Sequence, residues 1–459
     1  MTTSLEASAL DTLRRAIPDH VFEIARVLER GGHRTWVVGG SLRDQLRTAL
    51  DGSDQNLGAD WDLATDAQPE VVQRLFKRVI PTGIKHGTVT VLLGQHGYEV
   101  TTLRGETDYT DGRRPDSVFF VDEIRKDLAR RDFTINAIAY DPLTHVVEDP
   151  FDGVGDLKRR LIRAVGSPGE RFGEDGLRVL RAARFVTTLE FDLDPATERA
   201  IEPSLDSFRK VSLERVRDEW IKTMKGRAPS RAFRVMRDHG LLAVTAPALL
   251  AGGGAGREAP LDVALRAVDA STPNGCVRFA ALLHNIGSSS TSDQHADHSA
   301  ELAFGLLSSL RFSNKERDRI VNLVRHHVAF DPDQRSDADL RRWLRRVGPE
   351  LLEDLQAVMS AIARAHAVSA EPPSTVTLDQ IQRLFERARV LLELAPPLSI
   401  AALALTGNDL RQELSLPPGP LLGRILQALL ELVLEDPEQN QRERLLVLAR
   451  ETATKLQSS

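Results

Sequence analysis

Residues 35–44 read TWVVGGSLRD, and residues 60–65 read DWDLAT. The first stretch begins as a β-branched run, stops at two glycines and continues with helical periodicity, whereas the second alternates as a strand does. A strand that enters a Gly-Gly turn at the start of a helix lets backbone N–H groups approach a phosphate closely. The first stretch therefore predicts a phosphate-binding turn with Arg43 near by, although a tight turn that simply needs glycine has the same pattern.

Two carboxylates occupy alternate positions of the second stretch. Because side chains of a strand alternate between its faces, Asp60 and Asp62 are expected on one face, with Trp61 on the other. Adjacent carboxylates repel unless a cation lies between them, and Mg²⁺ prefers hard oxygen ligands together with substrate phosphates. Glu99, on a later predicted strand, could supply a third carboxylate. A solvated acidic pair near a strand end is the alternative interpretation.

The chain changes character once, near residue 165. Before it, strand-like and helix-like segments alternate, including a hairpin at 88–104 with its turn at Gly94–Gly97 and a polar loop at 106–117. After residue 174 nearly every segment has helical periodicity. The prediction is a small α+β head followed by a long helical body.

Composition excludes several classes of protein. The 459 residues are 41% hydrophobic and carry a formal net charge of −6, so folded cores are expected and wholesale disorder is not. The single cysteine, Cys276, excludes an internal disulfide framework and a thiolate-rich zinc site. No secretory signal and no apolar run of about 18 residues is found, which predicts a cytoplasmic protein without a membrane partner.

Two further segments combine basic and polar residues. In ARRDFTINAIAYD (129–141), Arg130 and Arg131 offer guanidinium forks that suit triphosphate oxygens, and Asn136 lies in an apolar stretch where it needs a hydrogen-bond partner. In GEDGLRVLRAARF (173–185), helical spacing would place four charged residues on one face. These residues are Asp175, Arg178, Arg181 and Arg184. The alternatives are a basic pair at a helix start and an intrahelical ion pair beside a solvated stripe.

Taken together, these segments resemble the class II tRNA nucleotidyltransferase and bacterial poly(A) polymerase family. The resemblance rests on GGSLRD, DWD, RGETDYTDGRRPDSV, RRDFTINA, EDGLRVLRAARF and SLERVRDE, in family order, and continues through LLHNIG, RHH, GNDL and LPPGPLLGRIL. It implies a DNA polymerase beta-like nucleotidyltransferase head followed by an all-α neck, body and tail. The implied segments are 1–30 (N-terminal helical lead-in), 31–165 (head), 166–230 (neck), 231–370 (body) and 371–459 (tail).

The resemblance also implies roles for individual residues. Asp60 and Asp62 would hold Mg²⁺, and Gly40 and Arg43 would contact the triphosphate. Arg130 or Arg131, with Arg181 and Arg184, would complete the nucleotide site, while Asp175 and Arg178 match the pair that reads the incoming base. The implied reaction is the addition of CCA to the 3′ end of tRNA from CTP and ATP, with release of pyrophosphate.

Several alternatives remain open within and beyond this family. VIPTGIKHGTV (79–89) looks like the tRNA nucleotidyltransferase version of its segment, and the loop at 104–117 is not shortened as in CC-adding relatives. CCA addition is therefore favoured over CC-only addition and poly(A) synthesis, and A-only addition is hard to separate from it. A catalytically dead RNA-binding scaffold is the alternative from another class.

The helical body carries two features with alternative interpretations. His284 is followed by Asn285 where metal-dependent phosphohydrolases carry His-Asp, which favours a vestigial domain without hydrolase activity. The basic segments Leu157–Arg163 and Leu340–Gly348 are candidate tRNA contacts or, equally, solvated helix faces. The tail, through its GNDL and LPPGP elements, is expected to hold the tRNA elbow.

Overall fold

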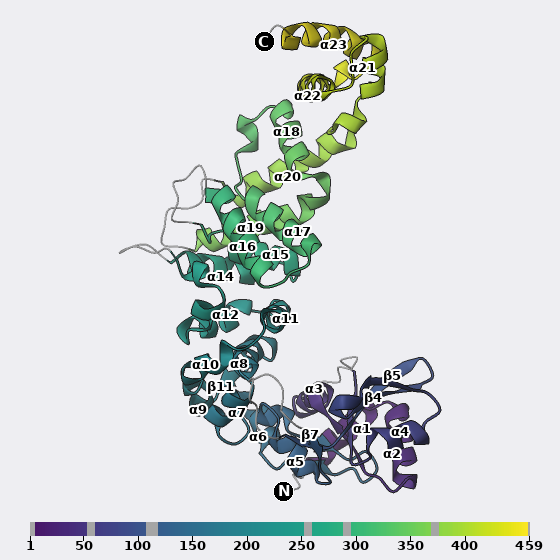
Figure 1. The fold of residues 1–459 in the computed structure, drawn as a ribbon. Coiled ribbons are helices and arrows are strands. Elements are labelled where there is room, and N and C mark those ends of the chain that lie inside the picture. Colours follow the sequence, from purple (N-terminus) through teal and green to yellow (C-terminus); the bar gives the residue numbers. More distant parts are fainter. Residues whose placement is uncertain are drawn as a thin grey trace. The chain divides into compact units, whose positions relative to one another are not determined.

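The computed structural model describes residues 5–52, 60–106, 118–251, 259–287, 295–368 and 376–457. The chain divides into two compact units, Met1–Pro247 and Ala248–Ser459, shown as a ribbon in Figure 1. Within the described ranges, every strand belongs to the first unit and the second is helical. The predicted α+β head followed by helices is thus confirmed, whereas the five segment boundaries remain predictions.

A mixed seven-stranded sheet forms the centre of the head, in the order β3-β4-β5-β2-β1-β8-β9. Strands β2 and β5 run parallel, and the other neighbours are antiparallel. The strands of this sheet are β1 (Thr35–Val38), β2 (Asp62–Thr65), β3 (Val79–Gly83), β4 (Thr88–Leu93), β5 (His96–Thr102), β8 (Ala139–Tyr140) and β9 (Val147–Glu148). A separate pair consists of β6 (Arg104–Glu106) and β7 (Val118–Phe120).

The predicted hairpin forms with a shorter turn than expected. Leu93 pairs with His96, so Gly94 and Gln95 alone make the loop, and Gly97 lies within β5 opposite Leu92. Gly94 has φ of 60°, a left-handed conformation that glycine adopts without strain. The predicted polar loop at 106–117 lies outside the described residues, apart from its first position at the end of β6.

Helices pack on this sheet through apolar side chains. They are α1 (Ala7–Ala16), α2 (Asp19–Arg30), α3 (Gly39–Leu50), α4 (Pro69–Leu75), α5 (Ile124–Ala129) and α6 (Gly153–Arg159). Ile124 and Leu128 of α5 share one buried cluster with Trp36 and Val38 of β1. Burial of such side chains is the main source of stability. This packing holds the end of α5 against the sheet. Arg130 and Arg131 follow directly after that helix.

The rest of the first unit consists of short helices built around α8 (Leu177–Thr188). This helix packs on α11 (Leu213–Thr223) and α12 (Pro229–Asp238). The other helices of this part are α7 (Pro168–Glu174), α9 (Pro195–Arg199), α10 (Leu205–Phe208) and α13 (Leu241–Thr245). The prediction that nearly every segment after residue 174 is helical is confirmed, and the exception among the described residues is one short strand. Strand β11 (Asp192–Leu193) pairs in parallel with β10 (Leu161–Ile162), a two-residue pairing too short to leave a periodic signal.

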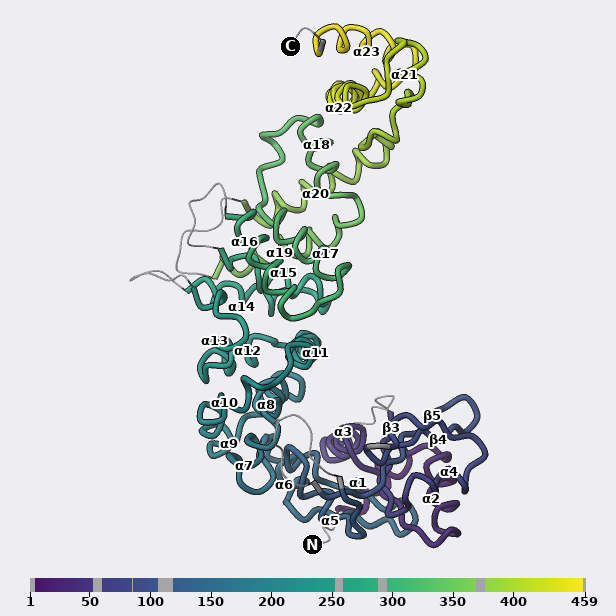
Figure 2. Tube along the Cα trace, in the orientation of Figure 1, coloured from purple at the N-terminus to yellow at the C-terminus, as the bar shows by residue number. Residues whose placement is uncertain are grey.

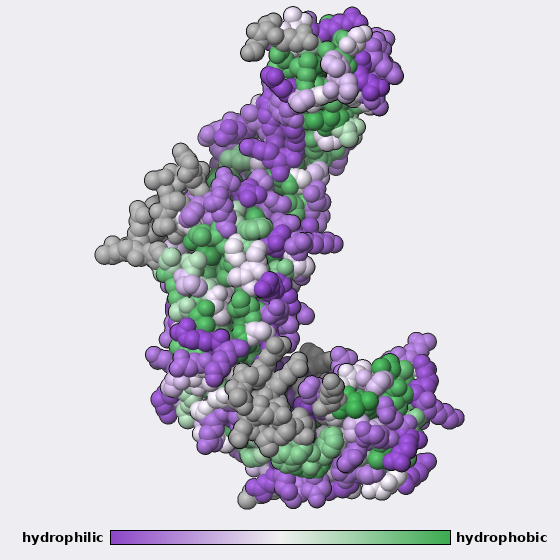
Figure 3. All heavy atoms as spheres, in the orientation of Figure 1, coloured by the Kyte–Doolittle hydropathy of each residue, from purple (hydrophilic) through white to green (hydrophobic). Residues whose placement is uncertain are grey.

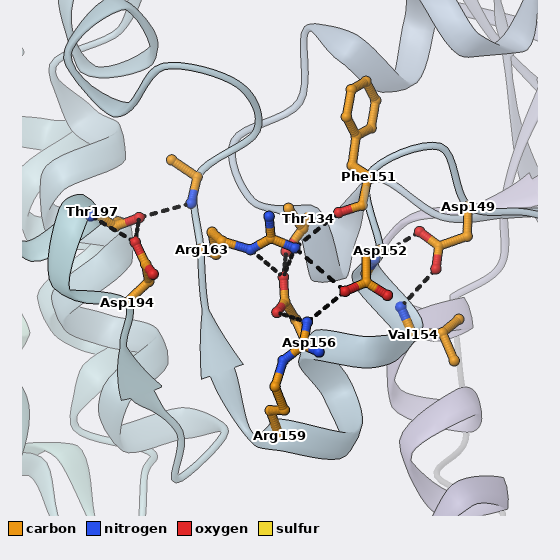
Figure 4. Close-up of polar contacts among 12 residues, drawn as sticks. Thr134, Asp149, Phe151, Asp152, Val154, Asp156, Arg159, Arg163, Asp194 and Thr197 are labelled. Atoms are coloured by element: carbon orange, nitrogen blue, oxygen red, sulfur yellow. Dashed lines mark hydrogen bonds and ion pairs between the residues drawn. The ribbon is translucent and has the colours of Figure 1, made fainter. Parts of the chain in front are cut away.

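A buried carboxylate connects α6 to the segment that contains Thr134. Asp156 of α6 is fully buried and accepts hydrogen bonds from the hydroxyl of Thr134 at 2.5 Å, from Arg159 at 2.6 Å and from Arg163 at 2.8 Å (Figure 4). Asp149 accepts from the backbone N–H groups of Gly153 and Val154 at the start of the same helix. The basic segment at 157–163 thus uses two of its arginines to pair with Asp156.

The described residues of the second unit form packed helices, with α21, α22 and α23 at the C-terminal end (Figure 2). Its helices are α14 (Pro260–Ala270), α15 (Gly275–Leu283), α16 (His295–Ser309), α17 (Asn314–His326), α18 (Asp337–Val347), α19 (Leu352–Ala367), α20 (Leu378–Glu393), α21 (Gly407–Glu413), α22 (Pro420–Glu435) and α23 (Arg442–Gln457). Helix α14 packs on α15 and α19, and α16 packs on α17. Leucines of α21, α22 and α23 form the core of the tail. Among the described residues, no helix has the length and apolar character needed to span a bilayer.

Candidate active site

Two acidic side chains meet at one end of the central sheet. Strand β2 begins at Asp62, which lies directly beside Glu99 of β5 in the parallel register. Asp60 precedes the strand and is exposed, while the intervening Trp61 is buried. The prediction that both aspartates lie on the strand is therefore wrong for Asp60. Its backbone carbonyl instead accepts a hydrogen bond from the hydroxyl of Ser41 at 2.5 Å.

The electrostatics at the Asp62–Glu99 pair, here called the acidic edge, favour the binding of a cation. Burial, then the negative charges of Glu99 and Asp60, raise the pKa of Asp62 to about 6, although Arg131 opposes them. A carboxylate whose ionised form is destabilised by neighbouring charge is stabilised when a cation binds. No three metal-ligating side chains of the described residues converge on one point. Carboxylate oxygens that leave coordination positions open fit Mg²⁺, which usually retains water and phosphate ligands.

The Gly-Gly turn lies against this acidic edge. Gly39 has φ of 86°, and a Cβ atom at that position would be 2.6 Å from a carboxylate oxygen of Asp62. Both observations require glycine at residue 39. Helix α3 begins in this turn, so its N-terminal N–H groups and Gly40 are available beside Asp62. The Gly-Gly turn and the Asp62–Glu99 pair therefore lie next to each other, and phosphate binding at the turn remains a prediction.

A buried carboxylate holds the two arginines that follow α5 in place. Asp127 of α5, which is 2% exposed, accepts from Arg130 at 2.7 Å and from Arg131 at 3.2 Å. Burial alone would raise the pKa of Asp127, but the two guanidinium groups hold it below its usual value. The Nε–H of Arg131 is buried without a partner among the described residues. Such a donor is suited to an anionic ligand.

A second buried carboxylate organises the centre of the site. Asp132 accepts from Arg181 at 2.6 Å and from the side-chain amide of Asn136 at 2.9 Å. Burial opposes its ionisation, yet Arg181 and Asn136 hold the pKa of Asp132 well below its usual range. Asn136 in turn accepts from Arg43 at 2.8 Å. The sequence predicted that Asn136 would need a hydrogen-bond partner. In the structure its amide oxygen and its amide nitrogen each have one.

Arg184, on α8, adds another guanidinium group to the site. Its Nε donates to Glu219 of α11 at 2.5 Å, and its guanidinium lies 4.0 Å from the centre of the Phe185 ring. The guanidinium groups of Arg43 and Arg181 lie on the same ring at 5.2 and 5.5 Å. Cation–π contacts of this kind hold cations close together without neutralising them.

Asp175 and Arg178 lie together but do not form an ion pair with each other. Asp175 is not on the predicted helix, because it has an extended backbone between α7 and α8. Its carboxylate pairs with Arg215 at 2.8 Å, and Arg178 pairs with Glu174 at 2.6 Å. The alternative interpretation, an intrahelical pair of Asp175 with Arg178, is therefore excluded, and each of the two side chains has its own partner.

One cavity of about 690 Å³ brings these groups together. Apart from Asp60, every residue predicted for the site lines it. The predicted residues that line it are Gly40, Arg43, Asp62, Glu99, Arg130, Arg131, Asn136, Asp175, Arg178, Arg181 and Arg184. Sequence reasoning missed Arg104, Asp127, Asp132, Arg215 and Lys222, which also line it. Asp132 and Arg215 lie within RRDFTINA and SLERVRDE, so those motifs carried a signal for both.

The histidine that the sequence places in a vestigial domain lies in the core of the second unit, and the vestigial character of that domain remains a prediction. His284 is 1% exposed, and its Nδ1 lies 2.8 Å from the carbonyl oxygen of Ala281. His327 lies beside it with ring centroids 5.3 Å apart, and its Nδ1 is 2.6 Å from the carbonyl oxygen of Val324. Burial lowers the pKa of both imidazoles. They form a buried neutral pair, and the predicted absence of hydrolase activity remains a prediction.

The second basic segment, at 340–348, lies on α18, where hydrophilic residues cover the surface (Figure 3). Arg342 and Arg345 pair with Glu431 of α22 at 3.2 and 2.7 Å. Arg341 donates to the carbonyl oxygens of residues 434 and 435 at the end of α22. Three arginines of this segment thus bind another helix of the same unit, whereas Arg346 is exposed. The tRNA contact at this segment remains a prediction.

Comparison with known proteins places these features in a family. Three family models match in order along the chain: the poly A polymerase head domain at residues 35–163, a probable RNA and SrmB-binding site of polymerase A at 190–251, and a putative tRNA nucleotidyltransferase domain 2 at 294–449. The match to the head model covers the sheet, the Gly-Gly turn and the arginines after α5.

Curated relatives and solved structures agree with these models. The CCA-adding enzyme of Lactobacillus johnsonii is 45% identical over 218 residues, so the chain matches 53% of that relative's length. The CCA-adding enzyme of Lactobacillus delbrueckii subsp. bulgaricus is 35% identical over 90% of this chain and 92% of its own. The Bacillus stearothermophilus CCA-adding enzyme, solved in complex with CTP, is 28% identical with a TM-score of 0.71, covering 99% of this chain and 100% of its own. With its nucleotidyltransferase head and helical continuation, the chain belongs to the family of CCA-adding enzymes.

Proposed function

We propose that this chain adds CCA to the 3′ end of tRNA, using CTP and ATP with Mg²⁺ and releasing pyrophosphate, in the cytoplasm. The observation that carries the proposal is that one cavity joins the Asp62–Glu99 edge, the Asp175–Arg178 pair and a set of arginines. These arginines, here called the arginine wall, are Arg43, Arg130, Arg131, Arg181 and Arg184. The relatives bear the same activity in their names, and one of the structures is a complex with CTP.

The acidic edge fits a divalent cation. Asp62 and Glu99, with Asp60 close enough to affect the pKa of Asp62, would hold Mg²⁺. When bound, the ion would lower the pKa of the attacking 3′ hydroxyl and neutralise charge on the α-phosphate. No side chain is assigned as general base.

The arginine wall would bind the triphosphate. Arg43, Arg131 and Arg181 approach the cavity from three different elements, and each is fixed by a hydrogen bond to a carboxylate or an amide. Guanidinium groups that are already oriented lose little conformational freedom when they bind phosphate oxygens. The N–H groups at the start of α3, the helix that carries Arg43, add further donors. Together they would place the α-phosphate beside Asp62.

Asp175 and Arg178 would select the base. Cytosine and adenine each carry an exocyclic amino donor beside a ring-nitrogen acceptor, which suits a carboxylate beside a guanidinium. Uracil and guanine present a carbonyl and a ring N–H there, so both side chains would lose a partner, at a cost of a few kcal/mol. A pair of side chains could in this way replace a nucleic-acid template.

The test uses the purified chain with Mg²⁺ and tRNAs that end at the discriminator base, at C or at CC. CTP, ATP or both are supplied, and products are resolved on a sequencing gel, with the Asp62→Ala variant as the control. Growth by CCA that then stops is the expected result. Addition of A alone to the CC-ended tRNA would make this a partial-addition enzyme, and a long adenosine ladder would make it a poly(A) polymerase. No extension would favour an RNA-binding scaffold without catalysis.

A further inference from the structure

The two side chains proposed to read the base are each held by an ion pair with a different residue, and one of those partners comes from another helix. Arg215 of α11 binds Asp175, and Glu174 at the end of α7 binds Arg178. If the chain has the proposed function, on which this inference rests, these pairs bear on how the site distinguishes CTP and ATP from UTP and GTP.

Arg215 leaves Asp175 with little freedom. Its two terminal nitrogens donate to the two carboxylate oxygens of Asp175 at 3.2 and 2.8 Å. The oxygen at 3.2 Å, Oδ1, also accepts the backbone N–H of Leu177 at 3.0 Å. Each carboxylate oxygen accepts about two hydrogen bonds. The remaining acceptor capacity of Asp175 is therefore mainly on Oδ2, pointing in one fixed direction.

Arg178 is fixed independently of Asp175. Its Nη1 donates to Glu174 at 2.6 Å and to the carbonyl oxygen of Arg171 at 3.0 Å. Its Nη2 donates to the carbonyl oxygen of Arg130 at 2.9 Å, which ties the base-reading residue to the arginine wall. A guanidinium carries five N–H donors, so two are left to donate to a base.

We propose that Arg215 is a specificity-determining positioning residue, which holds the free oxygen of Asp175 where an exocyclic amino group of cytosine or adenine would lie. The direction matters because uracil and guanine carry their donor one position away, on the ring nitrogen. A carboxylate free to rotate can accept from that ring N–H, while Arg178 donates to the neighbouring carbonyl. Loss of the Arg215 fork would therefore admit the wrong bases.

The experiment compares Arg215→Met and Arg215→Lys with the parent chain. Single-nucleotide addition is measured as kcat/KM for CTP against UTP on C-ended tRNA and for ATP against GTP on CC-ended tRNA. Dissociation constants for the four nucleotides are measured in parallel, so that the inference does not depend on turnover. Arg217→Met is the matched control, because Arg217 lies on the same helix, pairs with its neighbour Asp218 and does not line the cavity.

We expect Arg215→Met to reduce the discrimination against UTP and GTP by about tenfold or more, the scale on which lost hydrogen bonds change substrate selection. Arg215→Lys, which keeps the charge but not the fork, should recover part of it. Arg217→Met should leave both ratios unchanged. An equal loss of affinity and turnover for all four nucleotides would overturn the proposal and reduce Arg215 to a purely structural residue. A parent chain that selects CTP and ATP in binding but transfers neither would refute the proposed function and not this inference.

Discussion

Asp62 of β2 and Glu99 of β5 are direct neighbours in the parallel register of the central sheet. Burial, and then the negative charge of Glu99, raise the pKa of Asp62 to about 6. The site thus has two neighbouring carboxylates whose repulsion a cation relieves. The pair comes from strands separated by the β3–β4 hairpin in the sequence, so its formation depends on the strand order of the sheet. We expect substitution of these two carboxylates to reduce turnover to different extents.

We expect Glu99→Gln to raise the Mg²⁺ concentration needed for half-maximal turnover by about 10- to 100-fold, the usual loss of metal affinity when a carboxylate at a metal site is removed. Asp62→Asn should reduce turnover further, because Asp62 lies between the Gly-Gly turn and Glu99. Titration of kcat with Mg²⁺ measures both effects. Asp66→Asn, just beyond the far end of β2, is the control and should match the parent chain. An unchanged Mg²⁺ requirement in Glu99→Gln would exclude Glu99 from the metal site.

The buried carboxylate of Asp156 should contribute strongly to the stability of the first unit. Asp156→Asn leaves Arg159 and Arg163 without their buried charge partner and replaces one of the two acceptor oxygens by an NH₂ group, which cannot accept. We expect a loss of about 2 kcal/mol in the free energy of unfolding, measured by urea denaturation. Asp152→Asn is a matched control, because the Asp152 side chain is 61% exposed and pairs with the same Arg159. Exposed pairs contribute about 1 kcal/mol or less, so equal losses would contradict this assignment.

Local pattern predicted much of the site, because its elements are short and follow one another closely. Thr35–Val38 could be recognised as a strand from its β-branched run, and the helix behind Gly40 from its periodicity. The same reasoning placed Asp60 on a strand that in fact begins at Asp62. Strand ends depend on where pairing with a neighbour stops, and here Val38 pairs with Asp62 as the last residue of β1.

Partners far apart in the sequence could not be predicted in the same way. Asp175 pairs with Arg215, forty positions later, and Asp132 pairs with Arg181, forty-nine positions later. Spacing within one helix instead favoured a local pair of Asp175 with Arg178. The tertiary packing of α8 on α11 brings Arg215 rather than Arg178 to Asp175, and a single sequence contains no direct record of that packing.

The arginines of α18 should separate into two functional groups. Arg345 donates to Glu431 at 2.7 Å and to Gln427 at 3.1 Å of α22, whereas Arg346 is exposed beside a cavity of about 350 Å³ lined by Phe330 and Trp343. We expect Arg346→Ala to weaken tRNA binding and to reduce the slope of log K against log salt by about 1, as for one lost phosphate contact.

Filter binding over a range of salt concentrations measures that slope, and Arg345→Ala is the comparison. Arg345→Ala should instead lower the melting temperature, because it breaks the contact between α18 and α22, and should leave the slope nearly unchanged. If Arg346→Ala alters neither affinity nor slope, the basic segment of α18 is a solvated helix face and not an RNA contact.

The buried histidine pair predicts that the second unit loses stability in acid. Burial, with the nearby His295 and His366, lowers the pKa of His327 to about 4, whereas an unfolded histidine takes up its proton near pH 6.5. The unfolded state therefore binds more protons between these values, so stability is complete above about pH 6.5 and falls as the pH decreases toward 4. His327 alone should cost about 2 kcal/mol between pH 7 and pH 5. Thermal unfolding at the two pH values measures this loss of stability. The His284→Leu/His327→Leu double variant should remove most of the pH dependence. The control His96→Leu, on the exposed hairpin that contains β5, should leave the pH dependence unchanged. A parent chain equally stable at both pH values would mean that the pair is hydrated or already protonated in the folded state.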